Sequence, residues 1–185
     1  IQISRTLDTK KNHDYLKLFG FGTKTAVEYP GESRGSLRPV SKWQGTEKFS
    51  FSYGYGYTSS ALQLAAAVNV VANNGIYVAP KMVLKTTDKE GITTSTPASA
   101  TRQVLSASTA QIMTSLMTDV VCYGTGKLAK MPGLSVAGKT GTAYKLQENG
   151  TYTNDEGART YFASFVGFLP ANNPRMTVLV SIDEP

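Results

Sequence analysis

Residues that ligate metals or carry nucleophilic chemistry are scarce in this sequence. Its 185 residues include one cysteine, Cys122, and one histidine, His13. A single cysteine excludes an internal disulfide and a cysteine-built metal site. No cluster of His, Asp and Glu stands at ligand spacing either. We therefore expect no metal and no cofactor, and we interpret His13 as a surface residue that opens a short helix.

Long apolar runs are also absent. No stretch of about eighteen apolar residues occurs, which excludes a membrane-spanning helix within these residues. The opening sequence IQISRTLDTKKNHD lacks the basic-then-apolar layout of a signal peptide and starts abruptly, as a chain cut from a longer one would. With 41% hydrophobic residues, the chain suits one globular domain or a piece of a larger one.

Acidic residues are outnumbered by basic ones, and the formal net charge is +6 at pH 7. Such a balance is compatible with nucleic-acid binding. The lysines and arginines are nevertheless scattered singly or in pairs, and no aromatic residues alternate with them in a basic patch. We interpret them as a solvated basic surface and expect no nucleic-acid partner.

Helical periodicity predicts a short helix over residues 12–18 and two longer helices. The clearest covers residues 61–72, because Ser60 and Gln63 fit a capping box and ALQLAAAVNVVA is apolar on nearly every face, which is typical of a helix at the centre of a fold. The other covers residues 106–121. Its apolar stripe is interpreted as core packing and consists of Ile112, Met113, Leu116, Met117, Val120 and Val121.

Strand patterns dominate the C-terminal third. Residues 75–96 predict two short strands around a turn at 88–91, and FSFSYGYGY, residues 49–57, is expected to be extended. Beyond Gly133, LSVAGKTGTAY, RTYFASFVGFL and RMTVLVSI predict three successive strands, with a turn at Asn149-Gly150. Three such strands form an antiparallel meander. With helices to cover it, the fold class is α+β, an antiparallel sheet flanked by helices.

Lys139 satisfies two short motifs. Read from Gly133, GLSVAGKT fits the phosphate-binding pattern G-x-x-x-x-G-K-[ST], whereas Lys-Thr-Gly is the strand motif of serine enzymes that penicillin acylates. A phosphate loop needs a strand before it and a helix after it. KLAKMP before Gly133 is no buried strand, and the few residues between Thr142 and Asn149 are too short for that helix. We therefore favour the strand interpretation.

A hydrolase elbow is also matched, by Gly31-Glu-Ser-Arg-Gly35. That elbow requires a strand before its serine and a helix after it. Pro30 and Pro39 flank this stretch instead, and His13 precedes Ser33, contrary to the order in that fold. We do not expect Ser33 to be a nucleophile.

As part of a strand, the Lys-Thr-Gly stretch has a physical use. Lys139 and Gly141 point to one face, and Thr140 and Thr142 to the other. Along an exposed edge, Lys139 would supply positive charge near a carboxylate, to which both threonine hydroxyls would hydrogen-bond. Gly138 and Gly141 would let a peptide approach as an added strand. The N–H of Thr142 could then help to hold an oxyanion.

Three long blocks, in order and correctly spaced, resemble a class B penicillin-binding protein, most of all the cell-division type. They are FSFSYGYGYTSSALQLAAAVNVVANNGIYVAP, GTGKLAKMPGLSVAGKTGTAYK and YFASFVGFLPANNPRMTVLVSIDEP. LFGFGTKTAVEYPGE is similar to the segment between that family's second and third active-site motifs. The resemblance implies the penicillin-binding protein transpeptidase and serine β-lactamase-like fold. It also implies a D,D-transpeptidase whose serine attacks D-Ala-D-Ala stem peptides of peptidoglycan.

The resemblance assigns Lys139, Thr140 and Gly141 to the third motif and, with Thr142, to substrate binding. It implies catalytic roles for Lys139 and for Thr142, whose backbone would form half of an oxyanion hole. The implied partners are peptidoglycan stem peptides, β-lactam antibiotics and divisome proteins. The implied location is the extracytoplasmic face of the bacterial cell membrane, with an anchor in an N-terminal segment that is not present here.

The family's Ser-x-x-Lys and Ser-x-Asn motifs are missing, because no lysine or asparagine has a serine at the required offset. We expect residues 1–185 to be the C-terminal portion of the transpeptidase domain, with both motifs upstream. Alone, this portion is predicted not to react with penicillin, and to expose an apolar face that the N-terminal half of the domain covers. A non-catalytic cell-wall or divisome protein of the same fold stays open as an alternative, and a P-loop nucleotide-binding protein as a remote one.

Overall fold

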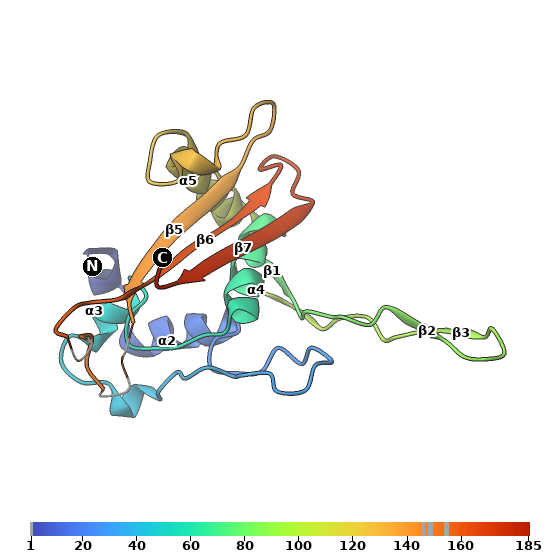
Figure 1. The fold of residues 1–185 in the computed structure, drawn as a ribbon, viewed down its shortest axis with the longest axis horizontal. Coiled ribbons are helices and arrows are strands. Elements are labelled where there is room, and N and C mark those ends of the chain that lie inside the picture. The colour runs from blue at the N-terminus through green and yellow to red at the C-terminus, as the bar shows by residue number, and fades with distance from the viewer. Residues whose placement is uncertain (1, 146, 148–149, 154–155) are drawn as a thin grey trace.

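The computed structural model describes residues 2–145, 147, 150–153 and 156–185. A three-stranded antiparallel sheet with two long helices behind it forms the centre of this part of the chain (Figure 1). The short helices α1 (Gln2–Thr6), α2 (Thr9–Leu18) and α3 (Glu47–Phe51) lie around one end of the sheet, beside and below it in Figure 1. The predicted α+β class, an antiparallel sheet flanked by helices, is confirmed.

The central sheet contains the three strands that the alternating pattern predicts. They are β5 (Ala137–Tyr144), β6 (Tyr161–Leu169) and β7 (Met176–Asp183), in the spatial order β5-β6-β7. Both pairings are antiparallel, and the register places Lys139 opposite Val166. The meander is therefore confirmed, with β5 and β7 at its edges. Asn149 of the predicted turn lies outside the described residues.

Helix α4 (Ala61–Ala72) runs behind the sheet as predicted. Ser60 Oγ accepts a hydrogen bond from the Gln63 N–H at 3.1 Å, and Gln63 Oε1 accepts one from the Ser60 N–H at 2.9 Å, which completes the capping box. Val70, in the last turn of the helix, is fully buried. The Gln63 amide nitrogen, with its two N–H donors, also lies within hydrogen-bond distance of three carbonyl oxygens, those of Gly20, Thr23 and Arg34. Gln63 thereby connects α4 to the irregular segment that follows α2.

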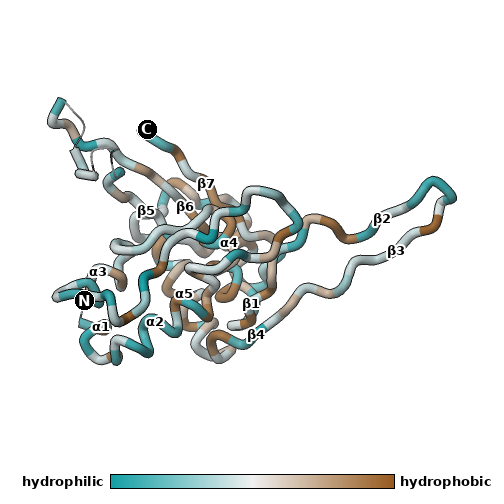
Figure 2. Tube along the Cα trace, turned by 90° about the horizontal axis from the view of Figure 1, so that it is seen from below, coloured by the Kyte–Doolittle hydropathy of each residue, from teal (hydrophilic) through white to brown (hydrophobic). Residues whose placement is uncertain are grey.

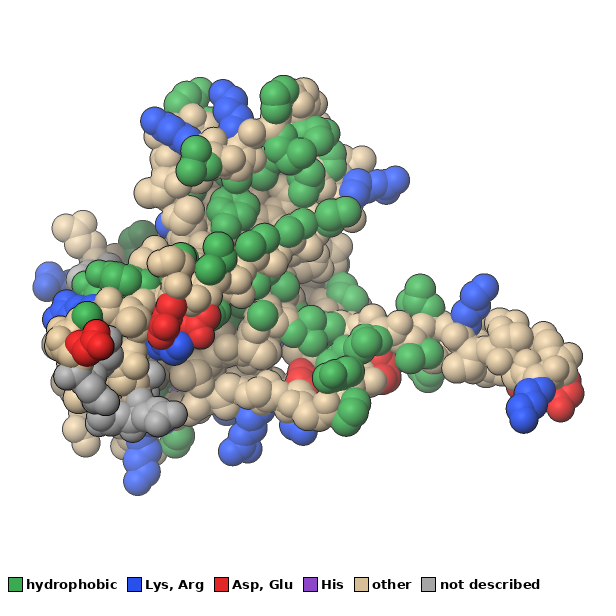
Figure 3. Space-filling view, viewed as in Figure 1, with side chains coloured by type: hydrophobic (Ala, Val, Ile, Leu, Met, Phe, Trp, Pro, Cys, Tyr) green, Lys and Arg blue, Asp and Glu red, His purple; other side chains and the backbone are tan. Residues whose placement is uncertain are grey.

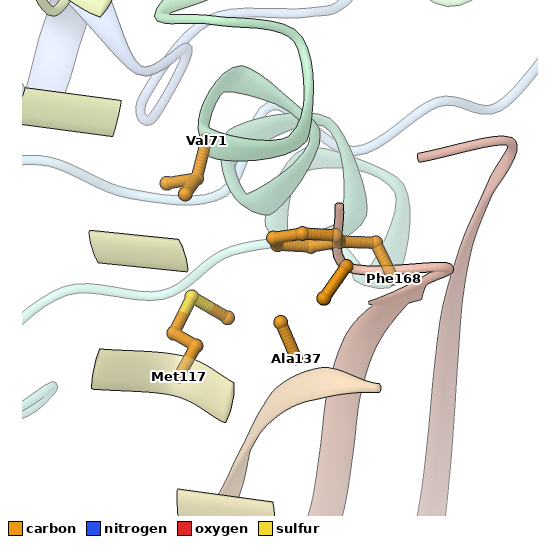
Figure 4. Close-up of a cluster of buried hydrophobic side chains, with 5 residues drawn as sticks. Val71, Met117, Ala137 and Phe168 are labelled. Carbon is orange, nitrogen blue, oxygen red and sulfur yellow. The ribbon is translucent and has the colours of Figure 1, made fainter. Parts of the chain in front are cut away.

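Helix α5 (Ala107–Cys122) joins α4 on the same side of the sheet. Met117 of α5 packs with Val71 of α4 and with Ala137 and Phe168, which face each other on β5 and β6 (Figure 4). Both Ala137 and Phe168 are fully buried. This cluster fixes β5 against the two helices, because close-packed interiors leave little freedom to shift.

The interpretation of the whole α5 stripe as core packing is wrong. Met117 and Val121 are buried, but Ile112 is 62% and Leu116 54% exposed, and Met113 is also exposed. The helix lies at the margin of the sheet behind β5, so only the side that faces β5 and α4 is covered (Figure 1). Helical spacing identifies an apolar face of a helix, but it does not show how much of that face packs against other elements.

The opposite face of the sheet is not covered by either long helix. Its side chains alternate with those of the core face, and on β7 they include Val180 and Ile182, each 53% exposed, and Met176. Hydrophobic side chains follow the sheet on the face turned to the viewer in Figure 3. The chain thus exposes an apolar sheet face, as predicted.

A two-stranded arm projects from the body (Figures 1 and 2). Its outer part is the predicted hairpin, in which β2 (Lys85–Thr87) pairs with β3 (Thr93–Ser95). Its base is a second pair, β1 (Ile76–Val78) with β4 (Thr101–Gln103), which the sequence did not indicate as a separate unit.

Two local predictions are wrong for the same reason. Residues 49–57 begin in α3 and continue in turns rather than as an extended segment. His13 is buried rather than exposed, with its ring 5.7 Å from that of Trp43. Trp43, on the C-terminal side of the 3-10 helix η1 (Val40–Lys42), also packs edge-on against buried Phe51 of α3 at 4.1 Å. This aromatic cluster pulls both segments inward, which overrides the local pattern.

Candidate active-site strand

Strand β5 presents the predicted motif along an open edge of the sheet. Lys139 and Thr142 are exposed, and Thr140 is half-buried. The Lys139 ammonium donates to the Thr140 carbonyl at 2.8 Å and lies 3.2 Å from its hydroxyl. The strand therefore brings Lys139, Thr140, Gly141 and Thr142 together, as the sequence predicts. Their roles toward a ligand stay predictions.

Thr125, from the connection between α5 and β5, extends this hydrogen-bonded group. Its hydroxyl lies 2.8 Å from the Thr140 hydroxyl. A hydroxyl oxygen can accept two hydrogen bonds and donate one. If Thr140 accepts from both Lys139 and Thr125, its own proton is free to point toward a ligand at the edge. Sequence reasoning missed Thr125, which precedes the motif by a whole loop.

The direction of the β5 backbone groups follows from two hydrogen bonds near its end. The Lys145 N–H donates to the Thr160 carbonyl, on the side of β6, whereas the Tyr144 N–H donates to the Tyr55 hydroxyl at 3.2 Å. Alternate residues of a strand turn their N–H groups to the same side. The N–H groups of Thr142 and Thr140 therefore point away from β6, to the open edge. An oxyanion at this edge would meet the donor that the sequence analysis assigns to Thr142.

The two glycines of the motif have a second role that the sequence did not reveal. A Cβ on Gly138 would lie 2.4 Å from the Phe165 ring, and one on Gly141 would lie 2.6 Å from Ser164 Oγ. Both neighbours belong to β6, so these glycines permit close packing within the sheet as well as approach from the edge.

A cavity of about 410 Å³ opens beside this strand. It lies between the N-terminal end of α4, the YGYGY segment and the core face of the sheet. Its lining includes Ser60, Leu64, Gly141, Thr142 and Ser164. Tyr57 also lines it, and burial raises the pKa of this phenol, which therefore stays neutral near pH 7. The cavity is the right size for a small ligand or a few protein side chains.

Five tyrosines form a wall where the open edge of β5 ends. Tyr144 lies 5.2 Å from Tyr161 and 6.4 Å from Tyr152, and Tyr55 lies 6.3 Å from Tyr152 and 5.8 Å from Tyr53, measured between ring centres. These residues come from four segments, namely the YGYGY stretch, β5, the connection after β5, and β6. The only sequence signal was the tyrosine-rich stretch 53–57, which gave no hint of its contact with β5.

The other two motif matches have the wrong surroundings. Residues 137–144 form one continuous strand through Lys139, so the helix that a phosphate loop requires is absent there. Ser33 lies in a loop, and its hydroxyl is engaged by the Gly35 N–H at 3.2 Å. Neither the nucleotide-binding interpretation nor the hydrolase elbow fits this geometry.

The described residues contain neither a candidate metal site nor a candidate membrane span. In that part of the chain, no three His, Cys, Asp or Glu side chains gather as a metal site would require. None of the described helices is both long and apolar enough to cross a membrane.

Comparison with known proteins gives relatives over the full chain. Penicillin-binding protein PbpB of Mycobacterium tuberculosis is 32% identical over 193 residues, which cover 100% of this chain and 28% of PbpB. The probable peptidoglycan D,D-transpeptidase PenA of Neisseria flavescens is 35% identical over 185 residues, which cover 100% of this chain and 42% of PenA. The chain thus spans less than half the length of these relatives.

Solved structures of penicillin-binding proteins also match this chain over its full length. Penicillin-binding protein 3 of Mycobacterium tuberculosis, complexed with aztreonam, matches 100% of this chain and 42% of its own with a TM-score of 0.93 and 32% identity. The transpeptidase domain of penicillin-binding protein 3 from Burkholderia pseudomallei matches 100% of this chain and 52% of its own, with a TM-score of 0.84 and 34% identity. The family described as penicillin binding protein transpeptidase domain matches residues 1–185. The chain therefore belongs to the penicillin-binding protein transpeptidase domain family.

Proposed function

We propose that this chain is the substrate-binding portion of a peptidoglycan D,D-transpeptidase that penicillin acylates. The open edge of β5 carries this proposal, because it combines a cation, two hydroxyls and outward N–H groups within four residues. A peptide that pairs with this edge would place its C-terminal carboxylate near Lys139 and Thr140. Its scissile carbonyl would then lie beside the N–H of Thr142.

Each residue has a definite task in this chemistry. Lys139 attracts the terminal carboxylate, and the hydroxyls of Thr140 and Thr142 hydrogen-bond it. The Thr142 N–H stabilises the negative charge that develops on the carbonyl oxygen when a serine attacks. D-Alanine leaves, the serine holds the acyl group as an ester, and an amine of a neighbouring stem peptide then takes it.

The serine must come from outside these 185 residues. We infer that residues 1–185 form the C-terminal portion of the domain, and that the segment carrying Ser-x-x-Lys enters the cavity beside Gly141 and Thr142. The cavity supports this inference by its position, since it adjoins the N–H that would face the reacting carbonyl. A second segment would cover the apolar sheet face that includes Val180 and Ile182.

The biological setting follows from the reaction. Cross-linking of peptidoglycan takes place outside the cytoplasmic membrane, so we propose an extracytoplasmic location, with an anchor elsewhere in the protein. One relative is named stage V sporulation protein D, from Bacillus subtilis. We propose a role in division, with divisome proteins as partners.

Labelling with a fluorescent penicillin tests the function. The full-length protein should form a covalent adduct, and the 185-residue chain alone should not. An adduct on the chain alone would show that a nucleophile lies within it, contrary to the proposal. No adduct on the full-length protein would favour the alternative, a non-catalytic protein of the same fold.

A further inference from the structure

An arginine stacks on the tyrosine that ends the open edge of β5. The guanidinium carbon of Arg159 lies 4.7 Å from the ring centre of Tyr144. Arg159 is exposed, and it precedes β6 by two residues. Stacking on an aromatic face orients a guanidinium while leaving its in-plane donors free for a ligand.

The path of a bound peptide leads toward this arginine. A peptide with its terminal carboxylate at Thr140 and its scissile carbonyl at Thr142 extends its preceding residues toward Tyr144. A strand advances about 3.3 Å per residue, so the residues one and two places before D-Ala-D-Ala lie beside Ala143 and Tyr144.

Pairing with β5 cannot continue beyond that point. The outward N–H of Tyr144 is already bonded to the Tyr55 hydroxyl. A peptide must therefore leave the edge there, and the wall of tyrosines directs it past Tyr144 and Arg159. Only a short segment of a bound peptide can therefore pair with β5. The residues before that segment would meet an aromatic and cationic surface.

Charge distinguishes Arg159 from the other cation nearby. Lys145 donates to Asp183 at 2.9 Å and to Glu184 at 3.0 Å, and these hydrogen bonds raise its pKa. Its charge is matched by the protein itself. Within the described ranges, no carboxylate lies in ion-pair distance of Arg159. Among the residues that the structure describes, Arg159 thus has no acidic partner that would compete with a ligand.

We propose that Arg159, held on Tyr144, binds a carboxylate carried by the donor peptide one or two residues before D-Ala-D-Ala. The subsite would select acidic stem peptides over neutral ones. This inference rests on the proposed function, since it takes its peptide direction from the roles of Thr140 and Thr142.

Matched peptides test the proposal on the full-length protein. Two peptides ending in D-Ala-D-Ala differ only in glutamate or glutamine at the preceding residue, and a second pair carries the same difference one residue earlier. The measured quantity is kcat/KM for release of D-alanine. In one pair we expect the acidic peptide to react about fivefold faster, as an exposed ion pair allows. Raising the salt concentration should shrink that ratio.

Variants then test whether Arg159 causes the preference for the acidic peptide. Arg159→Gln should bring the acid-to-amide ratio to about one, and Arg159→Lys should keep part of it, since it preserves the charge. The matched control is Arg175→Gln, at the opposite end of the sheet, which should keep the wild-type ratio. An adduct with benzylpenicillin shows that each variant is folded.

The experiment distinguishes failure of the Arg159 inference from failure of the proposed function. If the wild-type protein forms a penicillin adduct but shows no acidic preference in either pair, the inference is overturned. It is equally overturned if Arg159→Gln forms the adduct and keeps the preference. If the wild-type protein neither forms the adduct nor releases D-alanine, the proposed function itself fails, and the inference with it.

Discussion

The two edges of the central sheet differ in what they offer to a neighbour. The β5 edge carries a lysine and two threonines, and it is bounded by Thr125 at one end and by Tyr55 at the other. Strand β7 presents apolar residues instead, with Val180 and Ile182 half exposed on the face that no long helix covers. A short, polar, bounded edge suits a small extended ligand, whereas an apolar strand suits burial by more polypeptide. We therefore call the open edge of β5 the binding edge. We call the apolar sheet face that includes Val180 and Ile182 the docking face.

Removing the charge at the binding edge should have the largest effect. In the full-length protein, Lys139→Ala deletes the cation that is proposed to bind the substrate carboxylate. We expect the rate of acylation by fluorescent penicillin to fall about a hundredfold, since hydrogen bonds to charged groups contribute about 1.5–3 kcal/mol. A loss of less than threefold would show that Lys139 does not bind the carboxylate.

Closing the space between β5 and β6 should be next in size. Gly138→Ala places a methyl group 2.4 Å from the Phe165 ring, so the ring or the strands must shift. We expect the free energy of unfolding, measured by urea denaturation of the full-length protein, to fall by about 2 kcal/mol. Combining it with Phe165→Leu should restore part of that loss, because the two side chains compete for the same space. Strictly additive losses would contradict this explanation.

The hydroxyl network at the binding edge should have a smaller effect. Thr125→Val keeps the shape of the side chain but removes the hydroxyl beside Thr140. We expect acylation to slow about fivefold, as for the loss of one hydrogen bond that orients a donor. Thr125→Ser keeps the hydroxyl and should retain most of the rate. Equal rates for the valine and serine variants would exclude an orienting role.

Local patterns predicted the parts of the fold in which one segment carries the whole signal. The Ser60–Gln63 capping box and an all-round apolar helix identified α4, and alternation identified β5 to β7. The order of residues within β5 also predicted which side chains share a face. These features depend on neighbours within a few positions, which a sequence displays directly.

Contacts between distant segments were beyond the sequence. The tyrosine wall joins Tyr55, Tyr144 and Tyr152, and Thr125 reaches β5 across a loop. His13 is buried only because Trp43, thirty positions along the chain, packs against it. The prediction for the α5 stripe was wrong in the opposite direction, because residues expected to be buried are exposed. Their spacing is helical, but half of them have no packing partner within the described chain. Tertiary packing decides such cases.

The docking face should yield the smallest change in stability but a clear change in association. We expect the 185-residue chain to self-associate in sedimentation velocity, because exposed apolar strands bury each other. The double variant Val180→Thr/Ile182→Thr keeps β-branched side chains and should shift the chain toward monomer. Since both residues are half exposed, the free energy of unfolding should change by no more than about 1 kcal/mol. Ile92→Thr makes the same exchange on the projecting arm, where Ile92 is 64% exposed, and should leave association unchanged. If the arm variant dissociates the chain and the sheet variant does not, the contrast between the two edges of the sheet does not govern what the chain binds.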